Sequence, residues 1–463
     1  MFSADTYIDR RKRLQSDIES GLILFLGNGE SPINATDNCY FFRQDSSFLY
    51  FWGIDLPNLA AVIDVDADTE TVFGDDPSLE DIIWSGPQPS LLDRCRQIGV
   101  QQTASPGNLH EIVHRAIKKR RPVHFLPPYR TDQMVRLSDL LDFNRHVVAE
   151  YASKPLIRSV IRLRSVKSDQ ELAQMEAAIT INGAMQTTAM QLASPGIYER
   201  EVVGAIEGLA YGRSGRNLPF NTIFSIHGQT LHNHCHDNRM RAGDLVICDC
   251  GAESPLGYAS DTTRTIPVGG RFSGRQKEIY DVVLGMQMDA LAAMKPGVPF
   301  RDIHLVAAQR LASDLKALGL LLGNASGIVE SGAYALFFPH GLGHMLGLDV
   351  HDMESLGEDH VGYTAEIRRE SRFGLNRLRL AKPLEPGFVV TVEPGVYFIP
   401  QLVKLWRDEN RFSDQIDYRR LESFLDFGGV RIEDDVLVTS TGAMVLGPPI
   451  PKTATAVESC CNT

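Results

Sequence analysis

Acidic side chains stand at the ends of several short apolar runs that lie far apart in this 463-residue sequence. The runs, with one pair of histidines, are Leu245-Val-Ile-Cys-Asp249, Ala259-Ser-Asp261, His340-Gly-Leu-Gly-His344, Val389-Val-Thr-Val-Glu393 and Val430-Arg-Ile-Glu433. A carboxylate buried in an apolar strand is costly unless it is paired, so several that converge need a shared positive charge. Divalent metal ions would supply that charge.

Two of the acids flank a turn sequence. Asp249 and Asp261 are equally distant along the chain from Pro255, and Pro255 and Gly257 favour a turn. If residues 245–265 form a hairpin centred there, the two aspartates face each other with Cβ atoms about 5 Å apart. Two like charges so placed repel, and from the hairpin alone one aspartate could equally point to solvent.

The remaining acids and the histidines favour a metal site. Seven of the 13 histidines fall in two segments, and these are His227, His232, His234, His236, His340, His344 and His351. Four carboxylates and one imidazole carry a charge of about −4, which matches two divalent cations, and oxygen-rich ligation favours a hard ion such as Mn²⁺. Two ions about 3.5 to 4 Å apart generate a hydroxide at neutral pH and polarise a carbonyl. The predicted reaction is therefore hydrolysis.

The elements that must position these residues follow from periodicity and turn signals. In the first 150 residues we expect an amphipathic helix over residues 7–19 and buried strands at 22–26 and 59–65. Between the two strands lies an aromatic cluster, residues 40–52, which we assign to the core or to a subunit interface. Strands that alternate with helices predict an α/β domain.

A change of pattern near residue 153 marks the expected domain boundary. Ser168 and Glu171 form a capping-box pattern that opens a helix to about Leu192, and further helices are expected over 198–211, 274–294 and 300–318. Residues 220–268 and 387–446 are assigned mainly to strands. Helices and strands in separate blocks predict an α+β domain. Residues 245–251 and 389–395 also share one pattern of apolar run, acid and glycine, which indicates an internal duplication.

Length and composition exclude several classes of function. A chain of 463 residues is expected to form two domains, and its net charge of −12, without a basic block, argues against nucleic acid or an anionic membrane as partner. No apolar run approaches the roughly 20 residues of a membrane span, and the N-terminus lacks a signal-peptide pattern, so a cytoplasmic location is expected. The seven cysteines fit reduced thiols, with Cys248 and Cys250 in the core.

Taken in order, the motifs resemble those of the pita-bread metallopeptidases, specifically the proline-directed branch that contains aminopeptidase P and prolidase. Phe41-Phe-Arg-Gln-Asp-Ser-Ser-Phe-Leu-Tyr50 is similar to the N-terminal domain of that family, and residues 165–450 are similar to its catalytic domain. The resemblance implies a smaller α/β aminopeptidase P-type domain, residues 1–155, followed by an α+β pita-bread catalytic domain, residues 156–463. It also implies a homodimer or homotetramer.

The resemblance assigns roles to individual residues. The expected ligands of two divalent ions, chiefly Mn²⁺, are Asp249, Asp261, His344, Glu393 and Glu433. The expected catalytic residues are His232, which steadies the transition state, His351, beside the proline pocket, and Glu393, the general base. The expected substrate-binding residues are His340, Arg379, which would hold a substrate carboxylate, and Arg431, which would also orient Glu433. From the sequence alone, Arg379 could equally be a surface arginine, and His234 and His236 are expected to be structural.

The predicted function is that of an Xaa-Pro aminopeptidase, which cleaves the peptide bond between an N-terminal residue and a following proline through a metal-bridging hydroxide. An Xaa-Pro dipeptidase with the same metal site is the nearest alternative. A metal-free binding module, which the intact set of acids argues against, and an organophosphate hydrolase are the others. The segment 353–373 is longer and more charged than in compact aminopeptidases P, and we expect it to be a lid or specificity element.

Overall fold

The computed structural model describes residues 1–462, which form two compact units. Unit 1 comprises residues 1–164 and 353–360, and unit 2 comprises residues 165–352 and the chain from 361 onward. The predicted limit between residues 155 and 156 falls near the start of the helix α7 (Lys154–Ser165). The domain limits themselves stay a prediction.

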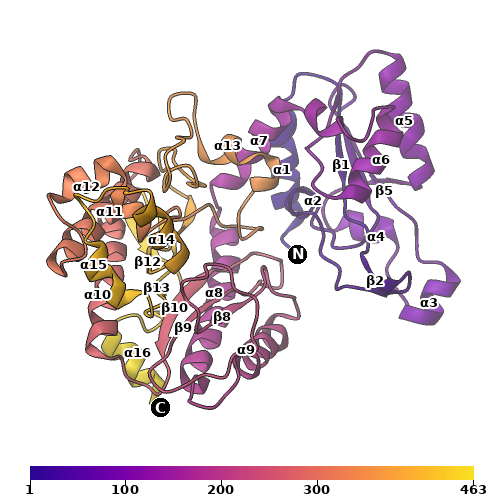
Figure 1. The fold of residues 1–463 in the computed structure, drawn as a ribbon. Helices are drawn as coiled ribbons and strands as arrows, with labels where there is room; N and C mark the ends of the chain where they lie inside the picture. Colours follow the sequence, from indigo (N-terminus) through magenta and orange to yellow (C-terminus); the bar gives the residue numbers. More distant parts are fainter. Residues whose placement is uncertain (463) are drawn as a thin grey trace. The chain divides into compact units, whose positions relative to one another are not determined.

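Unit 1 is built on a five-stranded sheet with the order β6-β5-β4-β1-β7 (Figure 1). Its strands are β1 (Leu22–Leu26), β4 (Ala60–Asp64), β5 (Thr69–Phe73), β6 (Gln102–Ala104) and β7 (Val123–His124). The three central strands are antiparallel, whereas β6 and β7 pair in parallel with β5 and β1 at the two edges. A separate hairpin joins β2 (Pro32–Ala35) to β3 (Asn38–Cys39). The predicted strand over residues 22–26 is β1.

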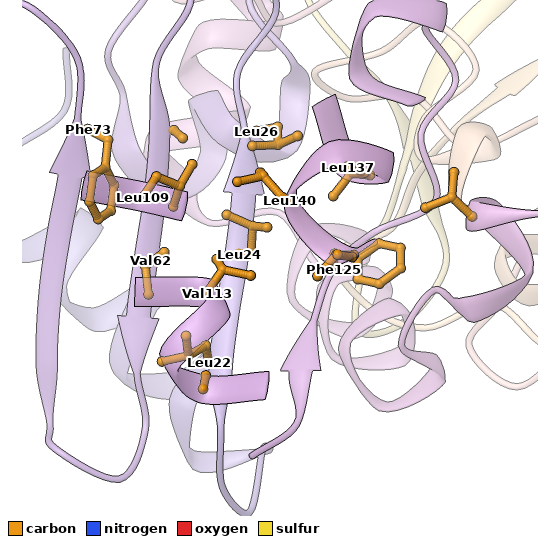
Figure 2. Packing of buried hydrophobic residues seen from close by; sticks show 14 residues of the cluster. Leu22, Leu24, Leu26, Val62, Phe73, Leu109, Val113, Phe125, Leu137 and Leu140 are labelled. Carbon is orange, nitrogen blue, oxygen red and sulfur yellow. The ribbon is translucent and has the colours of Figure 1, made fainter. Parts of the chain in front are cut away.

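Helices cover both faces of this sheet. The central strand β1 has apolar side chains on both faces, and each face is shielded from water by packed helices. Leu22 and Leu24 join a core with helices α5 and α6 (Figure 2), while Phe25 packs against Phe51 with ring centroids 5.2 Å apart. The helices of unit 1 that precede α7 are α1 (Ala4–Ser16), α2 (Ser46–Trp52), α3 (Leu79–Ser85), α4 (Leu91–Arg96), α5 (Pro106–Lys118) and α6 (Thr131–Leu141). Short 3₁₀ turns are η1 (Val148–Tyr151) and η3 (Glu354–Leu356). The aromatic cluster divides: the part in α2 is buried, whereas Tyr40 and Phe41 are exposed.

Unit 2 combines two long helix pairs with short strands. Its helices are α8 (Asp169–Leu192), α9 (Glu199–Ser214), α10 (Gly274–Ala293), α11 (Phe300–Ala317), α12 (Ala325–Ser331), α13 (Glu358–Gly362, which begins in unit 1), α14 (Pro400–Asp408), α15 (Tyr418–Leu421) and α16 (Ala454–Cys461), with 3₁₀ turns η2 (Ala333–Leu336) and η4 (Glu422–Phe424). Its strands are β8 (Ile223–Ser225), β9 (Leu245–Cys250), β10 (Thr262–Pro267), β11 (Val389–Val392), β12 (Gly395–Tyr397), β13 (Gly429–Arg431), β14 (Asp434–Val438) and β15 (Ala443–Val445). They form sheets β10-β9-β8, β11-β14-β15 and β12-β13.

Local sequence signals set most helix bounds in unit 2. The Ser168 hydroxyl accepts from the Glu171 amide while the Glu171 carboxylate accepts from the Ser168 amide, so the predicted capping box begins α8. The assignment of residues 387–446 mainly to strands missed α14, which begins at Pro400, a residue whose fixed φ suits the first turn of a helix. Among the described residues, no helix combines the length and apolar content of a membrane span.

Candidate metal centre and active site

The β9–β10 hairpin brings the two aspartates together in a register that differs from the predicted one. Asp249 pairs with Thr263, so the prediction that it faces Asp261 directly is wrong. The loop between β9 and β10 is centred on Leu256 instead of Pro255. This shift changes the residue opposite Asp249 from Asp261 to Thr263. Asp261 lies on the same face as Thr263 and diagonal to Asp249, because side chains alternate along a strand. Both carboxylates therefore still point to one side of the hairpin.

The segment that carries His344 lies directly beside β11. The Thr391 amide donates to the His344 carbonyl at 3.0 Å, and the Glu393 amide donates to the Leu342 carbonyl at 2.8 Å. A Cβ atom at Gly343 would collide with the Thr391 carbonyl, which explains the glycine in the middle of this histidine motif. The pairing places the His344 Nε2 atom 3.6 Å from a Glu393 carboxylate oxygen.

Side chains from these segments and from Glu433, the residue before β14, meet in one buried cluster. Asp261, His344 and Glu433 each offer one ligand atom, and these atoms all lie within 4.8 Å of one another. The His344 Nε2 atom is 3.5 Å from Asp261 Oδ2. With Glu393, the cluster thus contains four of the five predicted metal ligands, and the other three lie around the His344 ring.

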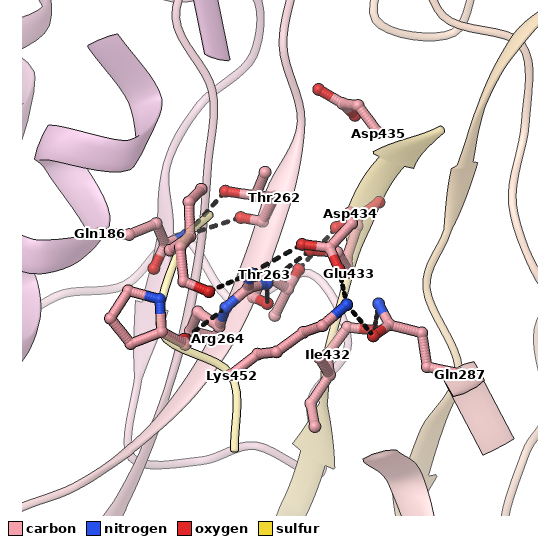
Figure 3. Close-up of polar contacts among 12 residues, drawn as sticks. Gln186, Thr262, Thr263, Arg264, Gln287, Ile432, Glu433, Asp434, Asp435 and Lys452 are labelled. Atoms are coloured by element: carbon pink, nitrogen blue, oxygen red, sulfur yellow. Dashed lines mark hydrogen bonds and ion pairs between the residues drawn. The ribbon is translucent and has the colours of Figure 1, made fainter. Parts of the chain in front are cut away.

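Asp249, the fifth predicted ligand, is linked to the cluster through Arg431. The Arg431 guanidinium donates to Asp249 Oδ2 at 2.7 Å, to the Tyr397 hydroxyl at 3.0 Å and to Thr263 Oγ1 at 3.2 Å. Thr263 Oγ1 in turn donates to Glu433 Oε2 at 2.7 Å (Figure 3). Arg431 therefore orients Asp249 directly and Glu433 through Thr263, while its contact with substrate stays a prediction.

The electrostatics of the cluster test whether its residues fit divalent metal ions. Burial raises the pKa of Asp261 and of Glu433 well above its usual range, and the neighbouring carboxylates raise both further. Burial also raises the pKa of Glu393. The Oδ1 atoms of Asp249 and Asp261 are buried without a hydrogen-bond partner. Hard cations bound here would give the orphaned carboxylate oxygens a partner and would reduce the repulsion between the carboxylates. The residues therefore fit such ions.

The four candidate histidines have distinct surroundings. The Nδ1 atom of His344 lies 3.0 Å from the Met345 carbonyl, which fixes a tautomer whose Nε2 lone pair faces the acids. The His351 ring stands edge-on to His344 at 4.4 Å, and burial lowers its pKa to about 2. The His340 Nε2 atom is 2.9 Å from the Tyr397 hydroxyl, and burial lowers the His340 pKa to about 3.

His232 and Arg379 approach the cluster from loops. His232 lies between β8 and β9 in an exposed position, and partial desolvation and the charge of Arg431 lower its pKa. Arg379 is half-buried after the predicted specificity segment, and its charge acts on His232, His351 and Glu393. All ten predicted site residues thus lie in unit 2, and the charges of both arginines act within the cluster.

Sequence reasoning missed the hydroxyl groups that orient these side chains. The Thr391 hydroxyl accepts from the His344 amide at 3.1 Å and lies 3.5 Å from Glu393 Oε1. Tyr397 connects Arg431 to His340. The only sequence signal is that Thr391 and Tyr397 flank Glu393 on the apolar strands β11 and β12, where a polar side chain needs a partner.

Two family models match the chain. Residues 173–440 match the model of metallopeptidase family M24, and residues 7–124 match the model of the aminopeptidase P N-terminal domain. A buried cluster of acids around one histidine, in a chain with this order of domains, defines the class of metallopeptidases. The chain belongs to metallopeptidase family M24.

Relatives and solved structures agree with this membership. Human Xaa-Pro dipeptidase is 30% identical over 460 residues, which span 97% of this chain and 90% of the relative. A probable Xaa-Pro aminopeptidase of Metarhizium acridum is 30% identical over 92% of this chain and 87% of its own length. The aminopeptidase PepP of Pseudomonas aeruginosa superimposes with a TM-score of 0.82 at 28% identity, covering 100% of this chain and 98% of that one. Aminopeptidase P from Escherichia coli with the inhibitor Pro-Leu gives 0.80 at 28% identity, with the same coverage.

These findings confirm three predictions made from the sequence. The family, the α+β pita-bread fold with a preceding α/β domain, and the class of metallo-exopeptidase all agree with the matches.

Proposed function

We propose that the protein is an Xaa-Pro exopeptidase that holds two divalent metal ions and hydrolyses the peptide bond between an N-terminal residue and a following proline. The observations that carry the proposal are the buried meeting of Asp261, His344 and Glu433, with a Glu393 oxygen 3.6 Å from His344 Nε2, and the orphaned buried carboxylate oxygens of Asp249 and Asp261. The matching relatives, which are named Xaa-Pro dipeptidases and Xaa-Pro aminopeptidases, support the substrate class.

The proposed metal ligands are the five residues predicted from the sequence, and their oxygen-rich set favours Mn²⁺. When bound, two such ions supply an activated water nucleophile and Lewis-acid polarisation of the scissile carbonyl. The ligands are Asp249, Asp261, His344, Glu393 and Glu433. Removal of metal with a chelator is expected to abolish activity, and added Mn²⁺ is expected to restore it.

The side chains of the chain itself move the protons and stabilise charge. Glu393, with a carboxylate oxygen 3.6 Å from His344 Nε2, is the proposed acceptor of a proton from the nucleophile. His232 has a lowered pKa, so its neutral ring keeps one N–H to donate to the oxygen of the scissile carbonyl as negative charge develops. His351, beside His344, is likewise neutral and forms a wall of the proposed proline pocket.

The proposed specificity is that of an aminopeptidase, because the matching solved structures are aminopeptidases P. A second candidate, the Xaa-Pro dipeptidase, is favoured by Arg379. The proposed role of Arg379, whose charge acts on His351 and Glu393, is to bind the carboxylate of a proline that ends the substrate. A longer peptide has no carboxylate at that position.

The decisive experiment compares an Xaa-Pro dipeptide with an Xaa-Pro-Yaa tripeptide on manganese-loaded protein. Cleavage of the tripeptide supports the aminopeptidase, and cleavage of the dipeptide alone supports the second candidate. In that second case Arg379→Met is expected to raise KM for the dipeptide at least tenfold, whereas Arg377→Met, an exposed arginine two residues away, is expected to leave it unchanged. Failure to cleave either peptide after metal loading would refute the proposed function.

The predicted homodimer or homotetramer and the cytoplasmic location stay predictions. Light scattering on the purified chain measures its mass in solution and tests the first.

A further inference from the structure

Two glutamines lie behind the acidic cluster, one on each long helix that backs it. Gln186 on α8 and Gln287 on α10 are both fully buried, with relative exposures of 0%. A buried amide is costly unless its groups are bonded, so each must be explained by what it contacts. Figure 3 shows both side chains reaching toward the strands that carry the acids.

The Gln186 amide spans the aspartate hairpin. Its Nε2 atom donates to the Thr262 carbonyl at 2.7 Å and to the Cys248 carbonyl at 3.2 Å. Cys248 directly precedes Asp249, and Thr262 directly follows Asp261. One amide nitrogen, with two N–H groups in a fixed plane, therefore ties together the main chain beside both aspartates.

The Gln287 amide spans the two strands that lead to the glutamates. Its Nε2 atom lies 3.1 Å from the Val392 carbonyl and 3.4 Å from the Ile432 carbonyl. These residues directly precede Glu393 and Glu433. The main chain around the two glutamates is bracketed by the strand pairs Val392–Asp434 and Gly395–Arg431, and Gln287 bonds the two carbonyls inside that interval.

The two contacts follow one pattern. In each, a glutamine from a helix bonds the main chain next to one pair of predicted metal ligands, and one member of each pair, Asp249 or Glu393, lies in a duplicated segment of the sequence. Gln186 also keeps its Oε1 atom buried without a partner among the described residues, a cost that an apolar side chain would avoid. Packing alone would therefore favour methionine or leucine at this position.

We infer that Gln186 and Gln287 are positioning residues that set the spacing within two pairs of metal-ligand carboxylates, Asp249 with Asp261 and Glu393 with Glu433. The inference rests on the proposed function, because it takes these acids to be metal ligands. Groups that orient metal ligands typically change metal affinity by 10-fold to 100-fold when they are removed. Loss of either amide is expected to weaken metal binding by that factor.

The test replaces each amide with a side chain of similar length that cannot donate. Gln186→Met and Gln287→Met are compared with wild type and with Gln191→Met, an exposed glutamine near the end of α8. The dissociation constant for Mn²⁺ is measured by competition with a fluorescent chelator, on metal-free protein that circular dichroism shows to be folded. The visible absorption of Co²⁺-loaded protein reports ligand geometry independently of activity. We expect 10-fold to 100-fold weaker binding and altered Co²⁺ bands in the first two variants only.

Several results would overturn the inference. Mn²⁺ constants within twofold of wild type, in variants that are merely less heat-stable, would show that the amides only stabilise the fold. An equal loss in Gln191→Met would show that the effect is not specific. If a methionine variant does not fold, Gln186→Ala or Gln287→Ala replaces it, since water can then reach the freed carbonyls, and the same limits apply.

Failure of the inference is distinguishable from failure of the proposed function. Wild-type protein that binds fewer than two Mn²⁺ ions and cleaves no Xaa-Pro peptide refutes the proposed function. Wild-type protein that binds two ions and cleaves such peptides, while both glutamine variants bind as tightly, refutes the positioning role alone.

Discussion

Replacement of Asp352 by asparagine is expected to loosen the turn that follows His344. Lys167 Nζ lies 3.0 Å from Asp352 Oδ2, and each side chain is 1% exposed. Asp352 also closes the turn, because its amide donates to the Met345 carbonyl at 2.9 Å and its Oδ1 accepts from the Asp349 amide at 3.3 Å. Asparagine has nearly the same shape but leaves the Lys167 ammonium buried without a counter-charge.

The size of the effect follows from this burial. Removal of one partner from a buried ion pair costs about 3–5 kcal/mol. At about 1.4 kcal/mol for each factor of ten, a cost of about 3 kcal/mol reduces protection from local opening by more than about 100-fold. Hydrogen exchange measured by mass spectrometry over residues 345–352 reports this opening. Exchange there is expected to accelerate by that factor in Asp352→Asn.

A double variant separates the charge effect from a packing effect. Lys167→Met combined with Asp352→Leu removes both charges, and apolar replacement of a buried pair is often neutral for stability or stabilising. The double variant is therefore expected to exchange more slowly than Asp352→Asn. Protection in Asp352→Asn within tenfold of wild type would refute the reasoning, because it would mean that the buried ammonium finds another partner or water at no cost.

Three further predictions concern the metal site, the pH dependence and the core. Asp261→Asn and Glu433→Gln are each expected to abolish activity by metal loss without misfolding, and two metal ions per chain retained in either, by elemental analysis, would contradict this. Burial lowers the pKa of Lys382 from 10.5 to about 8. Since the folded pKa is the lower one, the folded state gains stability as pH rises from 8 to 10.5. Lys382→Met should remove this gain, at most about 3 kcal/mol, in urea unfolding at pH 7 and pH 10. Phe73→Ala is expected to destabilise unit 1 by about 3–5 kcal/mol, and Trp84→Ala, at an exposed position, by less than about 0.5 kcal/mol, in thermal unfolding.

Local signals predicted the helices well because the decisive interactions lie close in sequence. The capping box at Ser168 and Glu171 needs only residues three apart, and it starts α8 where predicted. The register predicted for the aspartate hairpin was wrong, because the true register depends on the path of the connecting residues 251–261. The predicted turn at Pro255 does form a bend, but the strands are paired about Leu256.

The sequence by itself determined the chemistry of the site. Apolar runs that end in Asp249, Glu393 and similar acids make it costly to bury these carboxylates together without a shared positive charge, and that electrostatic cost predicts a cation site whatever the topology. Only the tertiary structure decided which atoms meet. Arg431 reaches Asp249 across 182 residues of sequence, and Gln287 reaches the strands before both glutamates from a helix more than 100 residues upstream. Such contacts depend on how helices pack on strands, which local propensity does not encode.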